Sequence, residues 1–217
     1  MPAPAPERPT QTARAARAGR TLVVGCAALA RDLRLVLEQL GVAGSVDLEL
    51  LPAPLHNRPE KIPERVAAVI DERRPDYEHV VVAYADCGTG GVLDAALGSR
   101  RVERLPGAHC YEFFAGSNVF AALCAEEPGT FFLTDFLARH FDALVWGGLG
   151  LDRHPELRDD YFRHYRRVVF LAQEGDAATE SKARRAADRL ELEFEIRRIG
   201  RGPVANALDD LINGGRP

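Results

Sequence analysis

The chain has 217 residues, 46% of them hydrophobic and 28% charged, with a formal net charge of −4. No apolar run approaches the roughly 20 residues that a membrane-spanning helix needs, and the N-terminal stretch lacks the apolar core of a signal peptide. The acidic balance offers no basic surface for nucleic acid, so we expect a cytoplasmic globular protein that binds neither membranes nor nucleic acid.

Residues 1–20 combine Pro, Ala, Thr and scattered Arg without a periodic apolar face. Such a segment buries too little apolar surface to offset the entropy lost on ordering, so the sequence predicts a disordered tail. The remainder, residues 21–217, is long enough for one α/β domain.

From residue 21 onward, short β-branched runs alternate with segments of helical periodicity, a pattern typical of repeated βα units and a mostly parallel sheet. The first three predicted strands enclose two predicted helices and form a βαβαβ half. The strands are expected within 21–26, 46–53 and 79–87, and the helices within 29–41 and 60–74.

The second half repeats this rhythm less clearly. Helices are predicted within 110–129, 131–141, 158–166, 181–192 and 203–212, and strands within 142–150, 166–173 and 193–200. The fold class is therefore a doubly wound, Rossmann-like α/β fold with two similar halves that meet around residues 105–130. Separate halves and one continuous sheet both remain open at this point.

Three of the four cysteines follow predicted strands or lie in a loop next to them. Cys26 ends the first strand, Cys87 follows the third and Cys110 ends the segment LPGAHC. Because parallel strands present their carboxyl ends at one edge, these thiols are expected to meet there, and His56 after the second strand is a fourth candidate ligand. The alternative is that each cysteine is a small core hydrophobe, and no C-x-x-C pair provides a strong metal signature.

Three further polar residues are candidates for proton transfer. His109 precedes Cys110 and could carry a proton or hydrogen-bond a ligand, although a plain structural role is nearly as plausible. Glu112 could act as an acid or base in the same region, and Asp152 lies two residues before His154 in a second loop. A turn with a side-chain cap is the commoner meaning of an Asp in such a loop.

Two glycine-rich loops follow the predicted strands. Gly88, Gly90 and Gly91 lie in DCGTGG, and Gly148 and Gly150 lie in GGLGLD. Glycines let a ligand approach the backbone closely, and successive N–H groups can form a nest for an anion. The simpler interpretation is that these glycines only allow sharp turns.

Several long and unusual phrases of the chain are similar to a known family. LPAPLHNRPEKIP, YADCGTGG, HCYEFFAG, EPGTFFLTDFLARHFD and GLGLDRHPEL resemble the family called domain of unknown function 1638, over about Thr21 to Gly202. The resemblance implies an association with corrinoid-dependent methyltransferase systems, because genes of this family often lie near theirs. It assigns no mechanism.

Thiolate ligands favour zinc or an iron–sulfur cluster over magnesium or calcium. A zinc ion held by Cys26, Cys87 and Cys110, with His56 as a fourth candidate ligand, would suit alkyl transfer to sulfur, with a thiol or another small substrate, such as a methyl donor, at the open position. An iron–sulfur centre would make the protein a redox or reactivating partner of a corrinoid methyltransferase. The third class is a non-catalytic protein that binds a small molecule or a corrinoid.

Overall fold

A computed structural model describes residues 19–213 of the protein. The predicted disorder of the N-terminal tail therefore lies outside the described residues, except for its last two positions. Of these, Arg20 belongs to the fold, because its guanidinium donates hydrogen bonds to both carboxylate oxygens of Asp47, at 3.2 and 2.6 Å.

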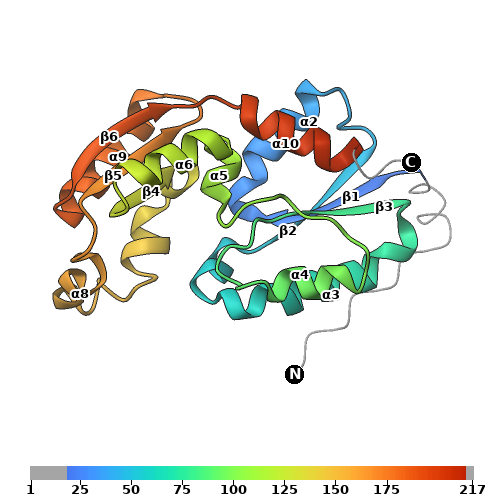
Figure 1. Ribbon diagram of the computed structural model, residues 1–217, viewed down its shortest axis with the longest axis horizontal. Helices are drawn as coiled ribbons and strands as arrows, with labels where there is room; N and C mark the ends of the chain where they lie inside the picture. The colour runs from blue at the N-terminus through green and yellow to red at the C-terminus, as the bar shows by residue number, and fades with distance from the viewer. Residues whose placement is uncertain (1–18, 214–217) are drawn as a thin grey trace.

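The first half is a three-stranded parallel sheet in the order β2-β1-β3. Its central strand is buried along its whole length, as expected where helices cover both faces. Helices α2 and α10 cover one face of this sheet, and α3 and α4 cover the other (Figure 1). The elements are β1 (Thr21–Cys26), η1 (Ala27–Leu29), α2 (Ala30–Gln39), β2 (Val46–Leu51), η2 (Ala53–Asn57), η3 (Pro59–Lys61), α3 (Ile62–Arg73), η4 (Arg74–Asp76), β3 (His79–Ala83) and α4 (Val92–Gly98).

The second half is another three-stranded parallel sheet, in the order β4-β5-β6. Val168 and Phe170 on strand β5 pack into the apolar cluster that includes helix α9, whereas Val169 and Leu171 pack on the side of α5 and α6. The elements are α5 (Cys110–Ala115), α6 (Ser117–Glu126), β4 (Thr130–Thr134), α7 (Asp135–Arg139), η5 (Asp142–Trp146), η6 (Pro155–Leu157), α8 (Arg158–Phe162), β5 (Arg167–Ala172), α9 (Ala177–Leu190), β6 (Glu193–Arg198) and α10 (Gly202–Asn213).

The last helix joins the two halves. Although α10 follows the second sheet in sequence, it packs against α2 and β3 of the first half and against α5. Its buried face, including Val204 and Leu208, belongs to the apolar core of the first sheet. The chain therefore crosses between the halves twice, once after the segment around Arg104 that pairs with β3 and once after strand β6.

The predicted α/β class with parallel sheets and flanking helices is confirmed. Three predictions within the second half are wrong. Residues 131–141, expected as one helix, form strand β4 and then helix α7, because Thr134 caps the helix by accepting a hydrogen bond from the Leu137 amide. The expected strand within 142–150 is a π-helical turn, η5. The expected helix over 110–129 is interrupted at Gly116, whose φ of 80° no regular helix adopts.

Candidate metal centre

Two of the expected ligands follow neighbouring strands of the first sheet. Cys26 is the last residue of β1 and its Sγ accepts a hydrogen bond from the amide of Ala28 at 3.4 Å, which caps the short helix η1. His56 lies in η2, directly after β2. The parallel pairing of Cys26 with Leu51 places these two segments together, and Sγ of Cys26 lies 3.7 Å from Nδ1 of His56.

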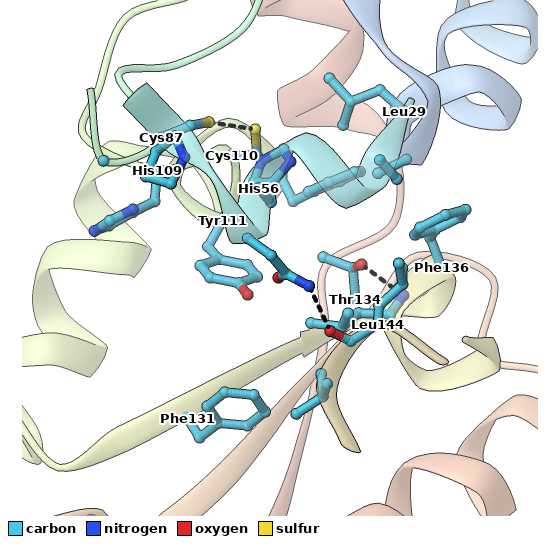
Figure 2. Close-up of a pocket in the computed structure, with 18 of the residues that line it drawn as sticks. Leu29, His56, Cys87, His109, Cys110, Tyr111, Phe131, Thr134, Phe136 and Leu144 are labelled. Atoms are coloured by element: carbon cyan, nitrogen blue, oxygen red, sulfur yellow. Dashed lines mark hydrogen bonds between the residues drawn. The ribbon is translucent and has the colours of Figure 1, made fainter. Parts of the chain in front are cut away.

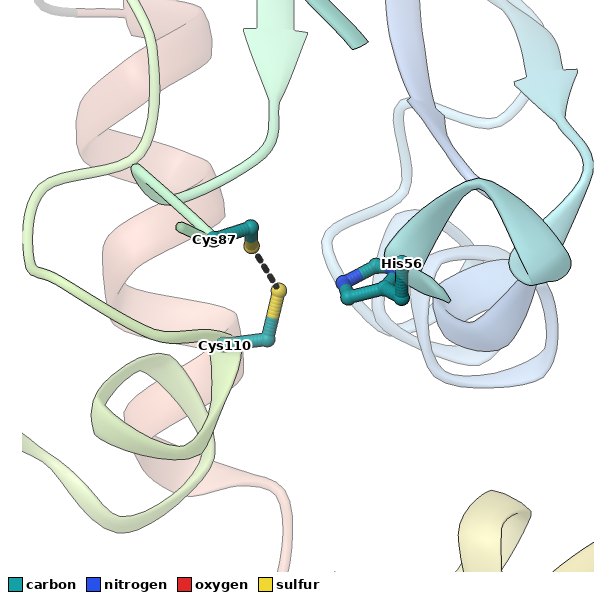
Figure 3. A group of neighbouring side chains, drawn as sticks. All are labelled: His56, Cys87 and Cys110. Atoms are coloured by element: carbon teal, nitrogen blue, oxygen red, sulfur yellow. Dashed lines mark hydrogen bonds between the residues drawn. The ribbon is translucent and has the colours of Figure 1, made fainter. Parts of the chain in front are cut away.

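Cys87 and Cys110 come together through backbone pairing that continues strand β3. The segment before α5 runs parallel to β3, with a bridge between Val82 and Arg104. Farther along, the amide of Cys87 donates to the carbonyl of Ala108 at 2.9 Å. As a result, Sγ of Cys87 lies 3.2 Å from Sγ of Cys110, the first residue of α5 (Figure 3).

The backbone at Cys87 is left-handed, with φ of 51°. Such a conformation is uncommon for a residue with a side chain and concentrates at functional sites. Here it allows the loop after β3 to turn immediately while the Cys87 side chain still faces Cys110 (Figure 3).

One potential ligand atom each from His56, Cys87 and Cys110 lies within 4.8 Å of the others. Cys87 is buried, Cys110 is half-buried, and His56 is exposed to the space in front of them. Two thiols and an imidazole form a donor set that suits a thiophilic metal ion. Cys26 lies outside this group of three but contacts it through His56. The structure thus contains a His/Cys/Cys group that could bind a metal.

The pKa values of Cys87 and Cys110 are shifted in opposite directions. The Cys110 thiol lowers the pKa of Cys87 by hydrogen bonding to it, and the same contact, together with burial, raises the pKa of Cys110 well above its ordinary value. At His56 burial opposes the charged form, but hydrogen bonds to Cys110 and Cys26 outweigh it and raise the pKa to about 10. Of these two thiols, Cys87 is therefore the more readily ionised.

A buried tyrosine adjoins the cysteines, and the sequence analysis overlooked it. Tyr84 is fully buried, its ring stacks on that of His56 with centroids 6.2 Å apart, and its hydroxyl makes no hydrogen bond of ordinary geometry within residues 19–213. Burial raises the pKa of Tyr84 first, followed by the Cys26 thiol, so the hydroxyl remains a proton donor. The signal in the sequence was a single hydroxyl within the apolar run HVVVAYADC.

The group opens into a cavity of about 410 Å³. His56, Cys87 and Cys110 lie on one side, and residues of β4, α7 and η5 from the second half form the other side (Figure 2). Because Thr134 ends β4 and also lines the space, the cavity lies beyond the carboxyl ends of strands from both sheets. This is the place where open parallel sheets bind ligands.

The loop DCGTGG is organised by its own aspartate. The carboxylate of Asp86 accepts hydrogen bonds from the amides of Gly90 and Gly91, at 3.0 and 2.9 Å, and from the hydroxyl of Thr89 at 2.7 Å. The Thr89 bond is the largest of the causes that lower the pKa of Asp86 to about 2. The amides expected to form an anion nest are thus bonded to Asp86, and of the three glycines Gly88 lines the cavity.

The second glycine loop lies next to a hydrogen bond that joins the two halves of the chain. A Cβ on Gly148 would come within 2.1 Å of the Leu144 carbonyl oxygen and 2.4 Å of Nδ2 of Asn57. The absence of a side chain there lets Asn57, from the first half, donate a hydrogen bond to the Leu144 carbonyl at 3.3 Å. Gly150, with φ of 75°, ends the helical turns that follow η5. Neither glycine lines the cavity next to the cysteines, within the described part of the chain.

The three candidate proton-transfer residues differ in position. His109 lines the cavity and is exposed, with its ring 6.4 Å from that of Tyr111. Glu112 accepts a hydrogen bond from the amide of Ala108 at 3.2 Å, so its carboxylate stabilises the start of helix α5. Asp152 is exposed in a turn and pairs with Arg153 at 3.9 Å. Of the three, His109 borders the cavity.

A second group of possible ligands consists of the carboxylates of Asp135, Glu174 and Asp176. The guanidinium of Arg139 contacts all three, at 3.6, 2.9 and 3.2 Å. Because Arg31 and Arg201 also pair with Glu174, arginines surround the three carboxylates, and we interpret this group as an ion-pair network that holds α7 to the loop after β5.

Comparison with known families identifies the chain's relatives. The model of the family described as "Protein of unknown function (DUF1638)" matches residues 50–208. The chain belongs to this family. His56, Cys87 and Cys110 lie within the matched range, whereas Cys26 precedes it. No curated protein and no solved structure matches the chain. Among the residues that the structure describes, no helix has the length and apolar character needed to cross a membrane.

Proposed function

We propose that Cys87, Cys110 and His56 bind one zinc ion whose fourth coordination position faces the cavity, and that the protein transfers an alkyl group, such as methyl, to a small thiol bound there. The observation that carries the proposal is the convergence of these three ligands at the wall of an otherwise apolar cavity. Three protein ligands with one open position are typical of catalytic zinc sites, whereas structural sites are closed by four.

The spacing of the sulfurs supports a single ion. Two thiolates on one tetrahedral zinc lie about 3.8 Å apart, since each Zn–S bond is about 2.3 Å. The two thiols are 3.2 Å apart, so only a small outward movement would admit the ion. Thiolates that ligate different irons of a cluster must lie farther apart than those on one ion, which makes the iron–sulfur alternative less compatible with this pair.

Cys26 has a different role in the proposed site. Its sulfur lies 3.7 Å from Nδ1 of His56, so it can accept a hydrogen bond from that nitrogen while Nε2 binds the metal. A hydrogen bond of this kind fixes the tautomer and the ring orientation of a metal-binding histidine. Cys26 therefore orients His56, and its replacement should weaken metal binding without abolishing it.

The donor set determines the chemistry. Two thiolates and a neutral imidazole balance the charge of Zn²⁺, so a bound substrate thiolate would make the centre anionic and favour attack on carbon. In the reaction a sulfur–carbon bond forms, the bond between that carbon and its leaving group breaks, and the leaving group departs with the electron pair. The proton of the thiol goes to solvent, for which exposed His109 at the cavity is a carrier. A corrinoid methyltransferase system is the partner that would supply the methyl group.

The first test is elemental analysis of protein purified without chelator or oxygen, together with its visible spectrum. We expect about one zinc per chain and no colour in the wild type and in Cys124→Ser, a matched control because Cys124 lies in α6 and packs against apolar residues away from the cysteine group. Cys87→Ser and Cys110→Ser should each lose most of the metal. Full metal content in both variants would refute the proposed centre, and several irons with sulfide absorption would establish the cluster instead.

The reaction itself is tested with zinc-loaded protein, a methyl-corrinoid and a small thiol, by detecting the methyl thioether by mass spectrometry. Product that depends on Cys87 supports alkyl transfer. Tight binding of thiol or corrinoid with no product would place the protein in the non-catalytic class.

A further inference from the structure

The cavity beside the cysteines is unusual in its lack of formal charge. Although 28% of the chain is charged, none of the described residues that line the cavity is Asp, Glu, Lys or Arg. The ionisable groups on its wall are His56 and His109, the two thiols and Tyr111. A ligand in this space would therefore find no carboxylate, ammonium or guanidinium partner on the wall beyond the metal-binding group.

The wall opposite the cysteines is apolar. It is formed by Phe131, Phe136, Leu137, Leu144, Val145 and Leu149, all from the second half of the chain. In Figure 2 the labelled members of this wall lie across the open space from His56 and Cys110. A molecule that reaches the metal ligands must place the rest of its surface against these side chains.

Two polar side chains of the wall already make hydrogen bonds to the backbone. The Asn57 amide donates to the Leu144 carbonyl, and the Thr134 hydroxyl accepts from the Leu137 amide. Tyr111 lines the space, and its hydroxyl points into it in Figure 2. This hydroxyl can exchange one hydrogen bond with a ligand in the cavity.

From this lining we propose that the substrate of the site is an uncharged, mainly apolar thiol, aliphatic or aromatic, whose sulfur reaches the Cys87–Cys110–His56 group while its carbon skeleton packs against the apolar wall. This inference rests on the proposed function. A carboxylate, sulfonate or ammonium on the thiol would lose its hydration against the apolar wall, and no Asp, Glu, Lys or Arg of the described lining could pair with it. Thiols of amino-acid type are therefore excluded, and the volume of about 410 Å³ admits a small organic molecule.

The test uses protein loaded with Co²⁺, whose absorption reports sulfur entering the coordination sphere. Three probes of similar size are titrated: propane-1-thiol, 3-mercaptopropionate and cysteamine. We expect the neutral thiol to bind at least about 100-fold more tightly than either charged one, because an unpaired charge is costly to bury. Equal affinities, or a preference for a charged thiol, would overturn the inference.

A charge placed in the wall should redirect this preference. Leu144→Lys, at a half-buried position, should improve binding of 3-mercaptopropionate relative to propane-1-thiol by at least about 10-fold. Leu137→Lys serves the same purpose if the first variant does not fold. The matched control is Leu35→Lys, at an exposed position outside the lining, which should leave the ratio unchanged. An unchanged ratio in both wall variants would contradict the inference.

Failure of the proposed function is detected separately with metal-free protein. Benzyl alcohol, benzoate and benzylamine differ in charge but not in their ring, and their binding is followed by thermal stabilisation. If cobalt does not bind but, of the three ligands, only benzyl alcohol stabilises the protein, the preference of the cavity for uncharged ligands is supported and the proposed metal function is refuted. If cobalt binds and the charged thiols bind as tightly as propane-1-thiol, the proposed metal function is supported and the inference of an uncharged substrate is refuted.

Discussion

Replacement of Tyr84 by Phe should change protein stability in opposite directions with and without metal. The Tyr84 hydroxyl is buried beside the cysteines and lacks a hydrogen bond of ordinary geometry within residues 19–213. A buried polar group left unpaired costs about 1–3 kcal/mol of desolvation. The ring stays in place in Tyr84→Phe, and the void left by one oxygen offsets part of the gain. We therefore expect metal-free Tyr84→Phe to be about 1 kcal/mol more stable than wild type, which raises Tm by about 2–4 °C for a chain of this size.

In the metal-loaded protein Cys87 and Cys110, which lie near Tyr84, are thiolates, and thiolates are good hydrogen-bond acceptors. A hydrogen bond from Tyr84 to a charged sulfur would contribute about 1.5–3 kcal/mol, so the variant should lose this amount. The expected result is a metal affinity at least about 10-fold weaker than wild type, since 1.4 kcal/mol corresponds to one factor of ten. The pKa of Tyr84, raised by burial and then by the Cys26 thiol, keeps the donor protonated throughout the accessible pH range.

The assay is urea unfolding of wild type and variant, each with chelator and with saturating zinc, together with zinc affinity measured by competition. Tyr161→Phe is the matched control, because Tyr161 is 46% exposed and should change neither form. Destabilisation of the metal-free variant by more than about 1 kcal/mol would show that the hydroxyl has a partner in the empty site. Equal changes with and without zinc would remove Tyr84 from the metal centre. Either result would refute this reasoning.

Three further predictions follow from other contacts. Gly148→Ala should lower the free energy of unfolding by about 1–3 kcal/mol, because its Cβ would come within 2.1 Å of a carbonyl oxygen, whereas Gly44→Ala, in open space, should have little effect; urea unfolding compares them. Treatment of metal-free protein with diamide should join Cys87 and Cys110, whose sulfurs are 3.2 Å apart, with loss of two hydrogens in the mass spectrum, and a disulfide that forms equally fast with zinc bound would argue against ligation by this pair. The pKa of Asp176 is lowered to about 2 by the threonine hydroxyl and amide in the first turn of α9, so its contribution to stability is complete above about pH 4 and is lost as the pH falls towards 2. Asp176→Asn should flatten the stability profile in that range, and an unchanged profile would contradict the assignment.

The first half of the fold could be predicted because its elements are long and regular. The short helix η1 links β1 to α2, and α2 and α3 show clear helical spacing of buried residues. In the second half β5, α9, β6 and α10 could be predicted as well, but the boundary between β4 and α7 could not, because β4 continues into α7 without a loop. The Phe-rich sequence of β4 and α7 fits a helical period as well as a strand. A single residue, Thr134, separates the two elements, because its hydroxyl caps α7. The apolar run within 142–150 likewise has no periodicity that distinguishes a strand from a π-helical turn.

The candidate site likewise depends partly on local sequence patterns, which can be recognised, and partly on tertiary contacts, which cannot. The sheet-edge rule placed Cys26, His56 and Cys87 in one region, because each follows a strand of the first sheet. The sequence predicted Cys110 there as well, although this residue follows no strand. It reaches Cys87 through backbone hydrogen bonds between an irregular segment and the extension of β3, and such pairing leaves no periodic signal in the sequence.

The apolar wall of the cavity depends on both halves and could not be read from either. Phe131 lies in β4, before Thr134, and Phe136 lies at the start of α7, after it. Both side chains line the cavity. Their partners across the cavity lie in the first half, and the Asn57–Leu144 hydrogen bond and the return of α10 hold the halves in register. The metal ligands come from the first half and the α5 segment, whereas the apolar wall comes from the second. Substitutions in the second half should therefore alter which thiol binds while metal content stays unchanged, and substitutions at the cysteines should do the reverse.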